Sequence, residues 1–380
     1  MTAPPAPPPP PPVEKQLLDA AAPARLSRFP AVVALGGGHG LAASLAALRL
    51  LTDRLTAVVT VADDGGSSGR LRAELPALLP PGDLRMALCA LAADDDVARQ
   101  WAGLLQHRFP GTGEVGGHAV GNLLLAGLLE TLGDPVTALD RVGALVGAAG
   151  RVLPLAAEPL DIEADVRREG GSTHTVRGQV AVATTTGRVL AVRLVPSRPR
   201  VSPETVSAVR DADWVVLGPG SLFTSQLPHL LVPAVAVALA EGRARTAYVL
   251  NLAPQPGETD GFSPAAHLEV LASHAPELRL DIVVADSDAV PAGGRECAEL
   301  IEAAAALGAH VLRAPVAVAA GGPDAIVGHA DGVGGDGARA ARHDPRRLAA
   351  VLRPHLHGTF PSGEHPAGLV DLGRSGPWRR

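Results

Sequence analysis

Aromatic residues and cysteines are scarce in this chain of 380 residues. Phe, Trp and Tyr together make up only 2% of the chain, so Val, Leu, Ala and Ile must build its core. The 2 cysteines, Cys89 and Cys297, lie far apart in the sequence and fit no metal-ligand spacing. We therefore expect two free thiols and a reducing compartment.

Lysine and long basic runs are also scarce. Lys15 is the only lysine, basic runs are short, and the formal net charge is -6. This charge gives no general attraction to nucleic acid or to an anionic membrane, so we expect no nucleic-acid partner. The N-terminus lacks the basic region of a signal peptide, and apolar stretches such as residues 230–240 are too short to span a bilayer. The sequence predicts a cytoplasmic protein without a membrane span.

The composition, with 47% hydrophobic and 19% charged residues, is that of a globular protein. Residues 1–28 are rich in proline, which predicts a disordered tail in preference to a segment that binds an aromatic groove of another protein. We expect residues 29–357 to form a single domain and residues 358–380 to form a flexible tail. Short apolar strands alternate with helices and end in glycine-rich or acidic turns. This pattern predicts a Rossmann-like α/β fold with a three-layer, doubly wound, mostly parallel sheet. The alternation within residues 151–200 predicts a small antiparallel excursion.

The stretch TVADDGGSSGRLR, residues 60–72, contains the strongest candidate site. An apolar run ends at Asp63 and Asp64, and glycines, serines and the pair Arg70 and Arg72 follow. Ligands of open α/β sheets bind outside the carboxyl ends of the strands, so these acids, donors and guanidinium groups predict a binding site. The alternative is a polar turn with an N-capping serine and a solvated arginine pair.

Two glycine-rich turns between a strand and a helix are candidates for phosphate contact. The first, GGGHG at residues 36–40, contains the glycines of a match to the dinucleotide fingerprint, Gly38-x-Gly40-x-x-Ala43. Its amides could approach phosphate oxygens at a positive helix end. The second, GPGSLFTS at residues 218–225, offers amides and hydroxyls to an anion. The fingerprint alone is weak, because many such turns are glycine-rich for packing reasons. The acidic pair that ends the next strand strengthens it, since an acid there recognises ribose.

Several single residues have two interpretations. Asp83 is a candidate N-cap of the next helix, whereas Arg85 is unfavourable for the dipole of that helix, which indicates another role. His118 and Asn122 are four residues apart, so on a helix they share a face and could contact one ligand. A capped helix start with a buried histidine explains them equally well. Glu258 is either a general base or ribose ligand, or a solvated loop residue.

Seven motifs stand in order over roughly residues 30–355. They are GGGHG (36–40), VADDGGSSGRLR (61–72), PPGDLR (80–85), GHAVGN (117–122), GPGSLFTSQLPHLL (218–231), NLAPQPGET (251–259) and HDP (343–345). Together they resemble the YvcK-like gluconeogenesis factor family, which is related to CofD-type 2-phospho-lactate transferases and shares their Rossmann-like fold. The resemblance implies a cytoplasmic protein that binds a nucleotide sugar such as UDP-N-acetylglucosamine. It also implies that the protein is required for normal cell shape and wall synthesis during growth on gluconeogenic carbon sources. No catalysed reaction is generally assigned to this family.

Two positions depart from this resemblance. His39 stands where the family usually has threonine, and Met86 stands where asparagine is common; both could alter ligand preference. The candidate ligand-binding residues are Gly36, Gly37, Gly38, His39, Gly40, Asp63, Asp64, Gly66, Ser67, Ser68, Arg70, Asp83, Arg85, His118, Asn122, Gly218, Gly220, Ser221, Thr224, Asn251, Glu258 and Thr259. Asp63 and Asp64 are also the candidate ligands of a Mg²⁺ ion.

Two functions fit these residues. In a ligand sensor or scaffold, the glycine turns hold a diphosphate, Asp63 contacts the ribose or Mg²⁺, and Arg70 and Arg85 neutralise the remaining charge. In a CofD-like transferase, Asp63 and Asp64 position Mg²⁺ against the diphosphate. An NAD-dependent dehydrogenase is a weaker interpretation, because no hydride-transfer constellation is evident. We further expect a homo-oligomer and protein partners in cell-wall synthesis.

Overall fold

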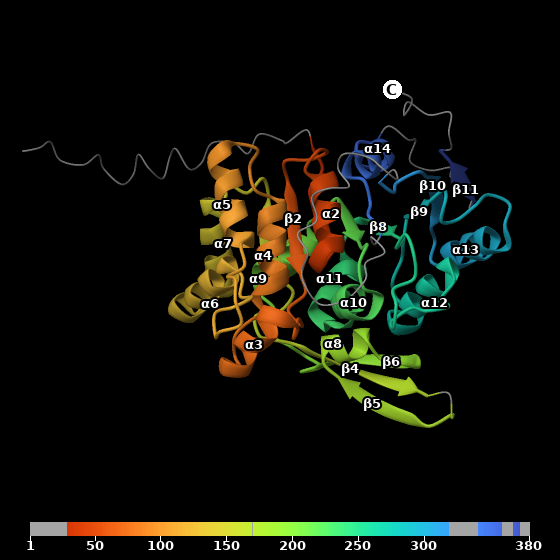
Figure 1. Ribbon diagram of the computed structural model, residues 1–380. Coiled ribbons are helices and arrows are strands. Elements are labelled where there is room, and N and C mark those ends of the chain that lie inside the picture. Colours follow the sequence, from red (N-terminus) through yellow and green to blue (C-terminus); the bar gives the residue numbers. More distant parts are fainter. Residues whose placement is uncertain (1–28, 169, 319–340, 359–367, 373–380) are drawn as a thin grey trace, which may run out of the picture.

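A parallel sheet lies at the centre of the computed structural model, which describes residues 29–168, 170–318, 341–358 and 368–372 (Figure 1). Its strands span Val32–Gly36 (β1), Leu55–Val59 (β2), Arg151–Pro154 (β3), Trp214–Leu217 (β7), Arg245–Val249 (β8), Ile282–Asp286 (β9), His310–Ala314 (β10) and Leu369–Asp371 (β11). In this described part the strand order is β11-β10-β9-β8-β7-β1-β2-β3, and all neighbours pair in parallel. The predicted Rossmann-like sheet is confirmed.

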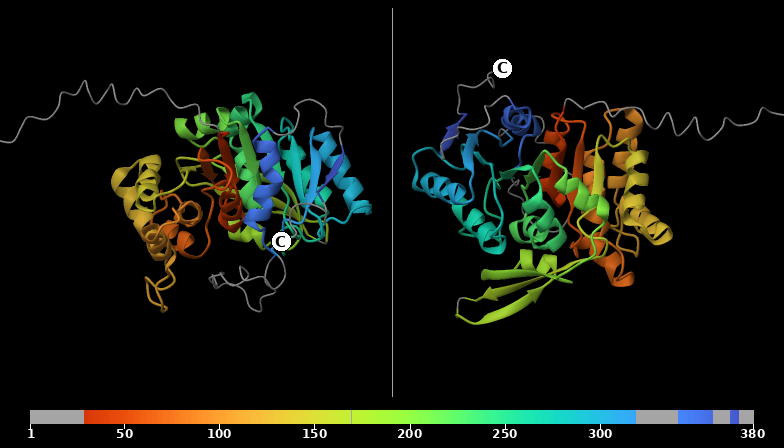
Figure 2. Two further views of the ribbon diagram at one scale, coloured as in Figure 1. Left: turned by 90° about the horizontal axis from the view of Figure 1, so that it is seen from above. Right: turned by 180° about the vertical axis from the view of Figure 1, so that it is seen from behind.

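Helices cover both faces of this sheet and produce three layers (Figure 2). The helices span Gly38–Leu48 (α2), Gly66–Glu74 (α3), Pro81–Ala90 (α4), Asp96–Gln106 (α5), Val120–Leu132 (α6), Pro135–Leu145 (α7), Gln179–Ala183 (α8), Pro203–Arg210 (α9), Leu227–Leu231 (α10), Pro233–Glu241 (α11), Pro264–His274 (α12), Arg295–Ala306 (α13) and Pro345–Leu356 (α14). A short π-helix, Leu222–Gln226 (η1), directly precedes α10. Helices α2, α4 and α14 pack together on one face, and α9 and α11 pack on the other.

The core lies between these layers. Every residue of β1, β7 and β9 is buried, as their apolar sequences predict for strands covered on both faces; Asp286, which ends β9, is the one charged residue in these three strands. Helix α2 buries Leu41, Leu45 and Leu48, which recur at helical spacing and so form one apolar stripe. The apolar run before Asp63, residues 57–62, predicts a strand; the observed strand is β2, which spans Leu55–Val59 and so begins and ends earlier.

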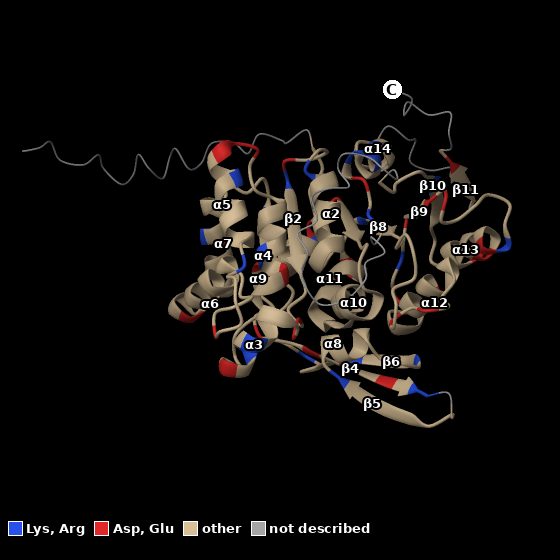
Figure 3. Ribbon diagram, viewed as in Figure 1, with Lys and Arg blue, Asp and Glu red and all other residues tan. Residues whose placement is uncertain are grey.

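A second, antiparallel sheet lies below the carboxyl edge of the main sheet in Figure 1. Its strands are Asp161–Arg167 (β4), Thr173–Arg177 (β5) and Arg188–Val195 (β6), in the order β5-β4-β6. Buried apolar residues alternate along β4 with acids that pair with arginines of β5 and β6, so charges of both signs appear there in Figure 3. The predicted excursion is confirmed, although β3, which we had included in it, pairs with β2 in the main sheet.

A Ser or Asp directly before a proline predicts a capped helix start, and the structure shows such caps. Ser202, Ser263 and Asp344 each accept a hydrogen bond from a backbone amide at the start of α9, α12 and α14. The prediction that Asp83 is an N-cap is wrong: Pro80 is the N-cap of α4, and Asp83 lies in its first turn. Proline suits the first helical position, so α4 begins before the point that we predicted.

The tails are only partly covered by the structure. The predicted disordered tail, residues 1–28, lies outside the described residues. Within the predicted flexible tail, residues 358–380, the structure instead places β11, which pairs with β10 at the edge of the main sheet. A three-residue edge strand has too short a pattern to be recognised in the sequence.

Among the described residues, no single helix is long and apolar enough to cross a membrane. Leu222–Leu231 and Pro233–Glu241 would reach that length and composition only as a pair, and they are bent by 72°. Leu222, Phe223 and Leu227 of this pair are buried in the core.

Replacement of Leu45 by alanine is expected to lower the free energy of unfolding by about 2–5 kcal/mol, because a cavity replaces its fully buried side chain. Leu50→Ala is the control, since Leu50 lies just beyond the same helix and is 50% exposed. It should change the free energy of unfolding by less than about 0.5 kcal/mol. Urea denaturation followed by tryptophan fluorescence measures both values. Equal losses would contradict the packing of α2.

Candidate ligand-binding site

The predicted site residues gather at the carboxyl edge of the main sheet, around the adjacent strands β1 and β7. The chain moves from β1 toward one end of the sheet and from β7 toward the other, so this is the switch point at which such sheets bind ligands. The candidate residues come from five places. The turn after β1 contributes Gly36, Gly37, Gly38, His39 and Gly40, and the segment from β2 into α3 contributes Asp63, Asp64, Gly66, Ser67, Ser68 and Arg70. The starts of α4 and α6 contribute Asp83, Arg85, His118 and Asn122, the turn after β7 contributes Gly218, Gly220, Ser221 and Thr224, and the loop after β8 contributes Asn251, Glu258 and Thr259.

The turns after β1 and β7 meet at their backbones. A methyl group on Gly40 would lie 2.2 Å from the carbonyl oxygen of Pro219. On the other side of the turn after β1, a methyl group on Gly37 would lie 2.5 Å from Oδ2 of Asp83. No side chain fits at either position. The two glycines therefore let the turn after β1 touch both the turn after β7 and the start of α4.

Side chains from neighbouring elements hold the turn after β7. Nδ2 of Asn251 donates to the carbonyl of Gly220 at 2.8 Å, and its Oδ1 accepts from the Gly220 amide at 2.9 Å. Gln226 donates to the same carbonyl at 2.7 Å and accepts from the hydroxyl of Tyr248 at 2.7 Å. We did not predict roles for Gln226 and Tyr248, because contacts between distant segments leave no local signal in the sequence.

Glu258 occupies the hydrogen-bond donors of the same turn. Its carboxylate accepts from the hydroxyl of Ser221 and from the amide of Phe223, the latter at 2.9 Å. The Glu258 side chain is only 6% exposed, which excludes the solvated loop residue that we had considered. Burial raises the pKa of Glu258, while its hydrogen bonds act in the opposite direction. Thr259 beside it is buried and accepts from the Gln255 amide within its own loop.

Two carboxyl groups, Asp63 and Asp83, lie close enough for their charges to interact. Asp63 accepts from the amide of Gly65 at 2.9 Å, and burial raises its pKa. Burial, with a contribution from the charge of Asp63, raises the pKa of Asp83 to about 7, although the Gly38 amide donates to it. Neither acid forms a salt bridge within the described ranges. Repulsion between the two charges disfavours ionisation of both acids, and a bound cation would relieve that repulsion.

Asp64 has a different hydrogen-bond partner from Asp63. Its Oδ1 accepts from the amide of Val180 at 2.9 Å, at the start of α8. The charge of Asp64 still contributes to the raised pKa of Asp63. That Asp63 and Asp64 hold a magnesium ion stays a prediction. In the part of the chain that the structure describes, no group of three or more His, Cys, Asp or Glu residues is suited to a metal ion.

His118 and Asn122 meet at the hydroxyl of Ser67. Nδ1 of His118 lies 2.8 Å from that oxygen, and Nδ2 of Asn122 donates to it at 3.0 Å. His118 precedes α6, so the predicted shared helix face is wrong, whereas the buried, hydrogen-bonded histidine of the alternative is confirmed. Burial and the charge of Arg70 lower the pKa of His118, which favours its neutral form.

The two candidate arginines have different surroundings. Arg70 is exposed and donates to the carbonyl of Gly116 at 2.9 Å. Arg85 is 3% exposed, donates to Gln106 on α5, and lies against Gly121 on α6. Arg85 therefore connects α4 to α5 and α6. Because α4 begins at Pro81, Arg85 lies beyond the first turn, so the predicted conflict with the helix dipole does not arise. Of the two, Arg70 is the better candidate for ligand charge.

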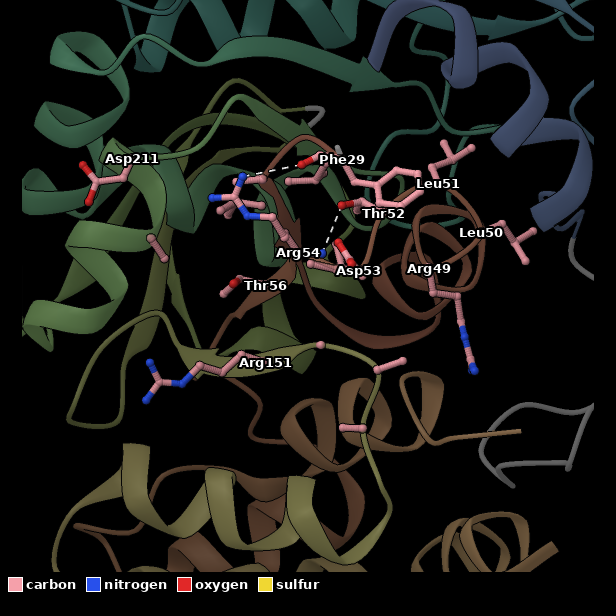
Figure 4. Close-up of a pocket in the computed structure, with 18 of the residues that line it drawn as sticks. Phe29, Arg49, Leu50, Leu51, Thr52, Asp53, Arg54, Thr56, Arg151 and Asp211 are labelled. Carbon is pink, nitrogen blue, oxygen red and sulfur yellow. Dashed lines mark hydrogen bonds between the residues drawn. The ribbon is translucent and has the colours of Figure 1, made fainter. Parts of the chain in front are cut away.

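A cavity of about 1110 Å³ lies at the opposite, amino edge of the sheet (Figure 4). It is lined by residues around the starts of β1, β2 and β3, and it includes none of the candidate residues. Two of its arginines already have partners, since Arg49 pairs with Asp94 and Arg151 pairs with Asp140. The buried acids and glycine turns lie at the carboxyl edge instead, so we place the candidate site there.

Comparison with known proteins gives consistent matches. The model of the family described as 2-phospho-L-lactate transferase CofD matches residues 32–311. A Mycobacterium tuberculosis H37Rv protein, provisionally named gluconeogenesis factor, is 52% identical over 324 residues, which cover 84% of this chain and 89% of the relative. The gluconeogenesis factor of Bacillus subtilis is 35% identical over 332 residues, or 85% and 97% of the two chains. A crystal structure of a UPF0052 family member from Bacillus halodurans has a TM-score of 0.70 at 32% identity, over 84% of this chain and 98% of that one.

Asp83→Asn is expected to make the stability less dependent on pH. The pKa of Asp83 rises from its usual 3.8 to about 7 on folding, so its contribution to stability is full below pH 3.8 and is lost as the pH rises through 7. Because asparagine stays neutral, the variant does not lose this stability. Its free energy of unfolding relative to that of the wild type should therefore be about 2 kcal/mol higher at pH 8 than at pH 5.

Urea denaturation at both pH values measures this gain. The control is Asp96→Asn, because Asp96 occupies the first turn of α5 with an exposed side chain. It should shift the free energy of unfolding equally at both pH values. An Asp83→Asn variant that behaves like this control would contradict the buried, acid-paired environment of Asp83.

Proposed function

The chain belongs to the CofD family and, within it, to the gluconeogenesis factors, and from this premise we propose that it is a sensor of a nucleotide sugar of the UDP-N-acetylglucosamine kind. One observation carries the proposal: two strand-to-helix turns meet at the switch point of the sheet, where Gly40 lies against Pro219. Dinucleotides and nucleotides bind in this place in sheets of the same design. An extended ligand with a diphosphate at its centre suits a crevice between two such turns.

Each part of a nucleotide sugar has a counterpart at this edge. The turn at Gly40 opens α2, whose positive end favours a diphosphate. Ser221 adds a hydroxyl from the turn after β7, and exposed Arg70 supplies positive charge. Asp63 follows β2, the position from which an acid contacts ribose hydroxyls in this fold.

The proposed cellular role follows the family. Binding of the nucleotide sugar in the cytoplasm would be read by protein partners in cell-wall synthesis, with the chain acting as a homo-oligomer. The outcome would be normal cell shape and wall homeostasis during growth on gluconeogenic carbon sources. In this proposal the protein binds its ligand without converting it.

A CofD-like transferase is the second candidate, and the pair Asp63 and Asp83 favours it. Two acids with raised pKa values and no salt bridge among the described residues suit a magnesium ion, which usually takes one or two carboxylates together with substrate phosphates. Mg²⁺ bound there would neutralise charge on a diphosphate during phosphoryl transfer. Asp64, the other predicted ligand of the ion, accepts a hydrogen bond from the Val180 amide at the start of α8.

Calorimetric titration separates the two candidates. The purified chain is titrated with UDP-N-acetylglucosamine, UDP-glucose, GDP and NAD, with and without Mg²⁺, and each mixture is then analysed by chromatography. The sensor proposal expects binding of the uridine sugars and recovery of intact ligand. Preference for GDP, or any cleaved diphosphate, would overturn that proposal in favour of the transferase.

Gly40→Ala is expected to weaken binding of UDP-N-acetylglucosamine at least about tenfold, or about 1.4 kcal/mol, because the new methyl group forces the two turns apart. Gly103→Ala is the matched control. A methyl group on Gly103 of α5 meets nothing within 4 Å, so binding should not change. Calorimetry on both variants gives the affinities. Wild-type affinity in Gly40→Ala would show that the ligand does not use the contact between the turns.

A further inference from the structure

Glu258 reaches the turn after β7 from the loop that follows β8. Its carboxylate accepts from the Ser221 hydroxyl and the Phe223 amide, and the Thr224 amide contributes a further hydrogen bond. The side chain is 6% exposed. Across the described ranges no Lys or Arg forms an ion pair with it, so hydrogen bonds alone offset the loss of hydration.

These donors are of the kind that bind anionic ligands. A serine hydroxyl and successive backbone amides after a parallel strand form a concave set of donors suited to phosphate or carboxylate oxygens. They lie at the switch point, beside the contact between Gly40 and Pro219. Glu258 thus places an internal anion where the proposed diphosphate needs donors, and both cannot use the same hydrogen bonds.

The Glu258 loop has room to move. A cavity of about 680 Å³ lies beside it, lined by Glu258, Phe262 and neighbouring loop residues, and by residues 185–189 of the antiparallel-sheet segment. Gly257 and Gly261 flank the acid with φ values of 83° and 74°. Glycine adopts such angles without strain and also many others, so the loop can change conformation at these two points.

We propose that Glu258 is a built-in competitor of the ligand: a phosphate or diphosphate group displaces its carboxylate from Ser221 and Phe223, and the side chain moves toward the adjacent cavity. This inference rests on the proposed function, because it concerns the same site. It adds the residue that sets the affinity for the anionic group. It also gives ligand binding a structural consequence, since the cavity borders the segment that leads into β6.

Glu258→Gln tests this competition. Glutamine keeps the length of the side chain and an acceptor for the Phe223 amide, but it removes the charge. We expect the variant to bind inorganic pyrophosphate and UDP at least tenfold more tightly than the wild type in calorimetry. Glu269→Gln is the control, because Glu269 lines the same cavity, is exposed, and does not contact the turn after β7. It should leave both affinities unchanged.

The outcomes separate this inference from the proposed function. Unchanged or weaker pyrophosphate binding by folded Glu258→Gln would overturn the competition and leave Glu258 as a structural cap, even where UDP-sugars bind. Tighter pyrophosphate binding without any UDP-sugar binding would support the competition and contradict the proposed ligand. Thermal unfolding confirms that each variant is folded. If Glu258→Gln does not fold, Glu258→Asp provides the test, because its shorter side chain should also release the donors and tighten pyrophosphate binding.

Discussion

The backbone of the turn after β1 lies against the backbone of the turn after β7, and the candidate site depends on this contact. Gly40 makes it possible, because any side chain would overlap the Pro219 carbonyl. The parallel pairing of β1 with β7 brings the two turns to the same edge of the sheet. Asn251, Gln226 and Tyr248 then fix the second turn through Gly220. The strand order of the sheet, which changes direction between β1 and β7, therefore positions the two turns that form the candidate site.

Buried acids distinguish this edge from an ordinary packed surface. Asp83 accepts from the Gly38 amide in the turn after β1, and Glu258 accepts from the Phe223 amide in the turn after β7. Burial raises the pKa of both acids and of Asp63. Ionisation of any of the three therefore lowers the free energy of unfolding. If these side chains only accepted hydrogen bonds from amides, serine or asparagine would fulfil that role without this loss of stability. Three buried carboxyl groups at one edge therefore indicate a ligand or an ion.

The sequence predicted the elements whose signals are local. The alternating run at residues 188–195 and the apolar run at residues 214–217 predict strands, and β6 and β7 have these bounds. Ser202 and Asp344, each directly before a proline, predict the caps that the structure shows, because period and capping depend on neighbours in the chain. The candidate residues were also traced to one edge, since parallel strands align their carboxyl ends. Side-chain directions could not be predicted. Whether Arg85 points to a ligand or to Gln106 depends on helices that pack only in the folded chain.

Asp63 and Asp64 connect the candidate site to the antiparallel-sheet segment. The charge of Asp63 acts on Asp83 in the site, whereas Asp64 accepts from the Val180 amide on α8. Arg72, a few residues later, pairs with Asp161 of β4 at 2.7 Å. The same short segment therefore contacts the proposed ligand position and holds the second sheet from two points. A ligand that shifts this segment would move α8 and β4 with it, which is what a sensor needs and what a transferase can do without.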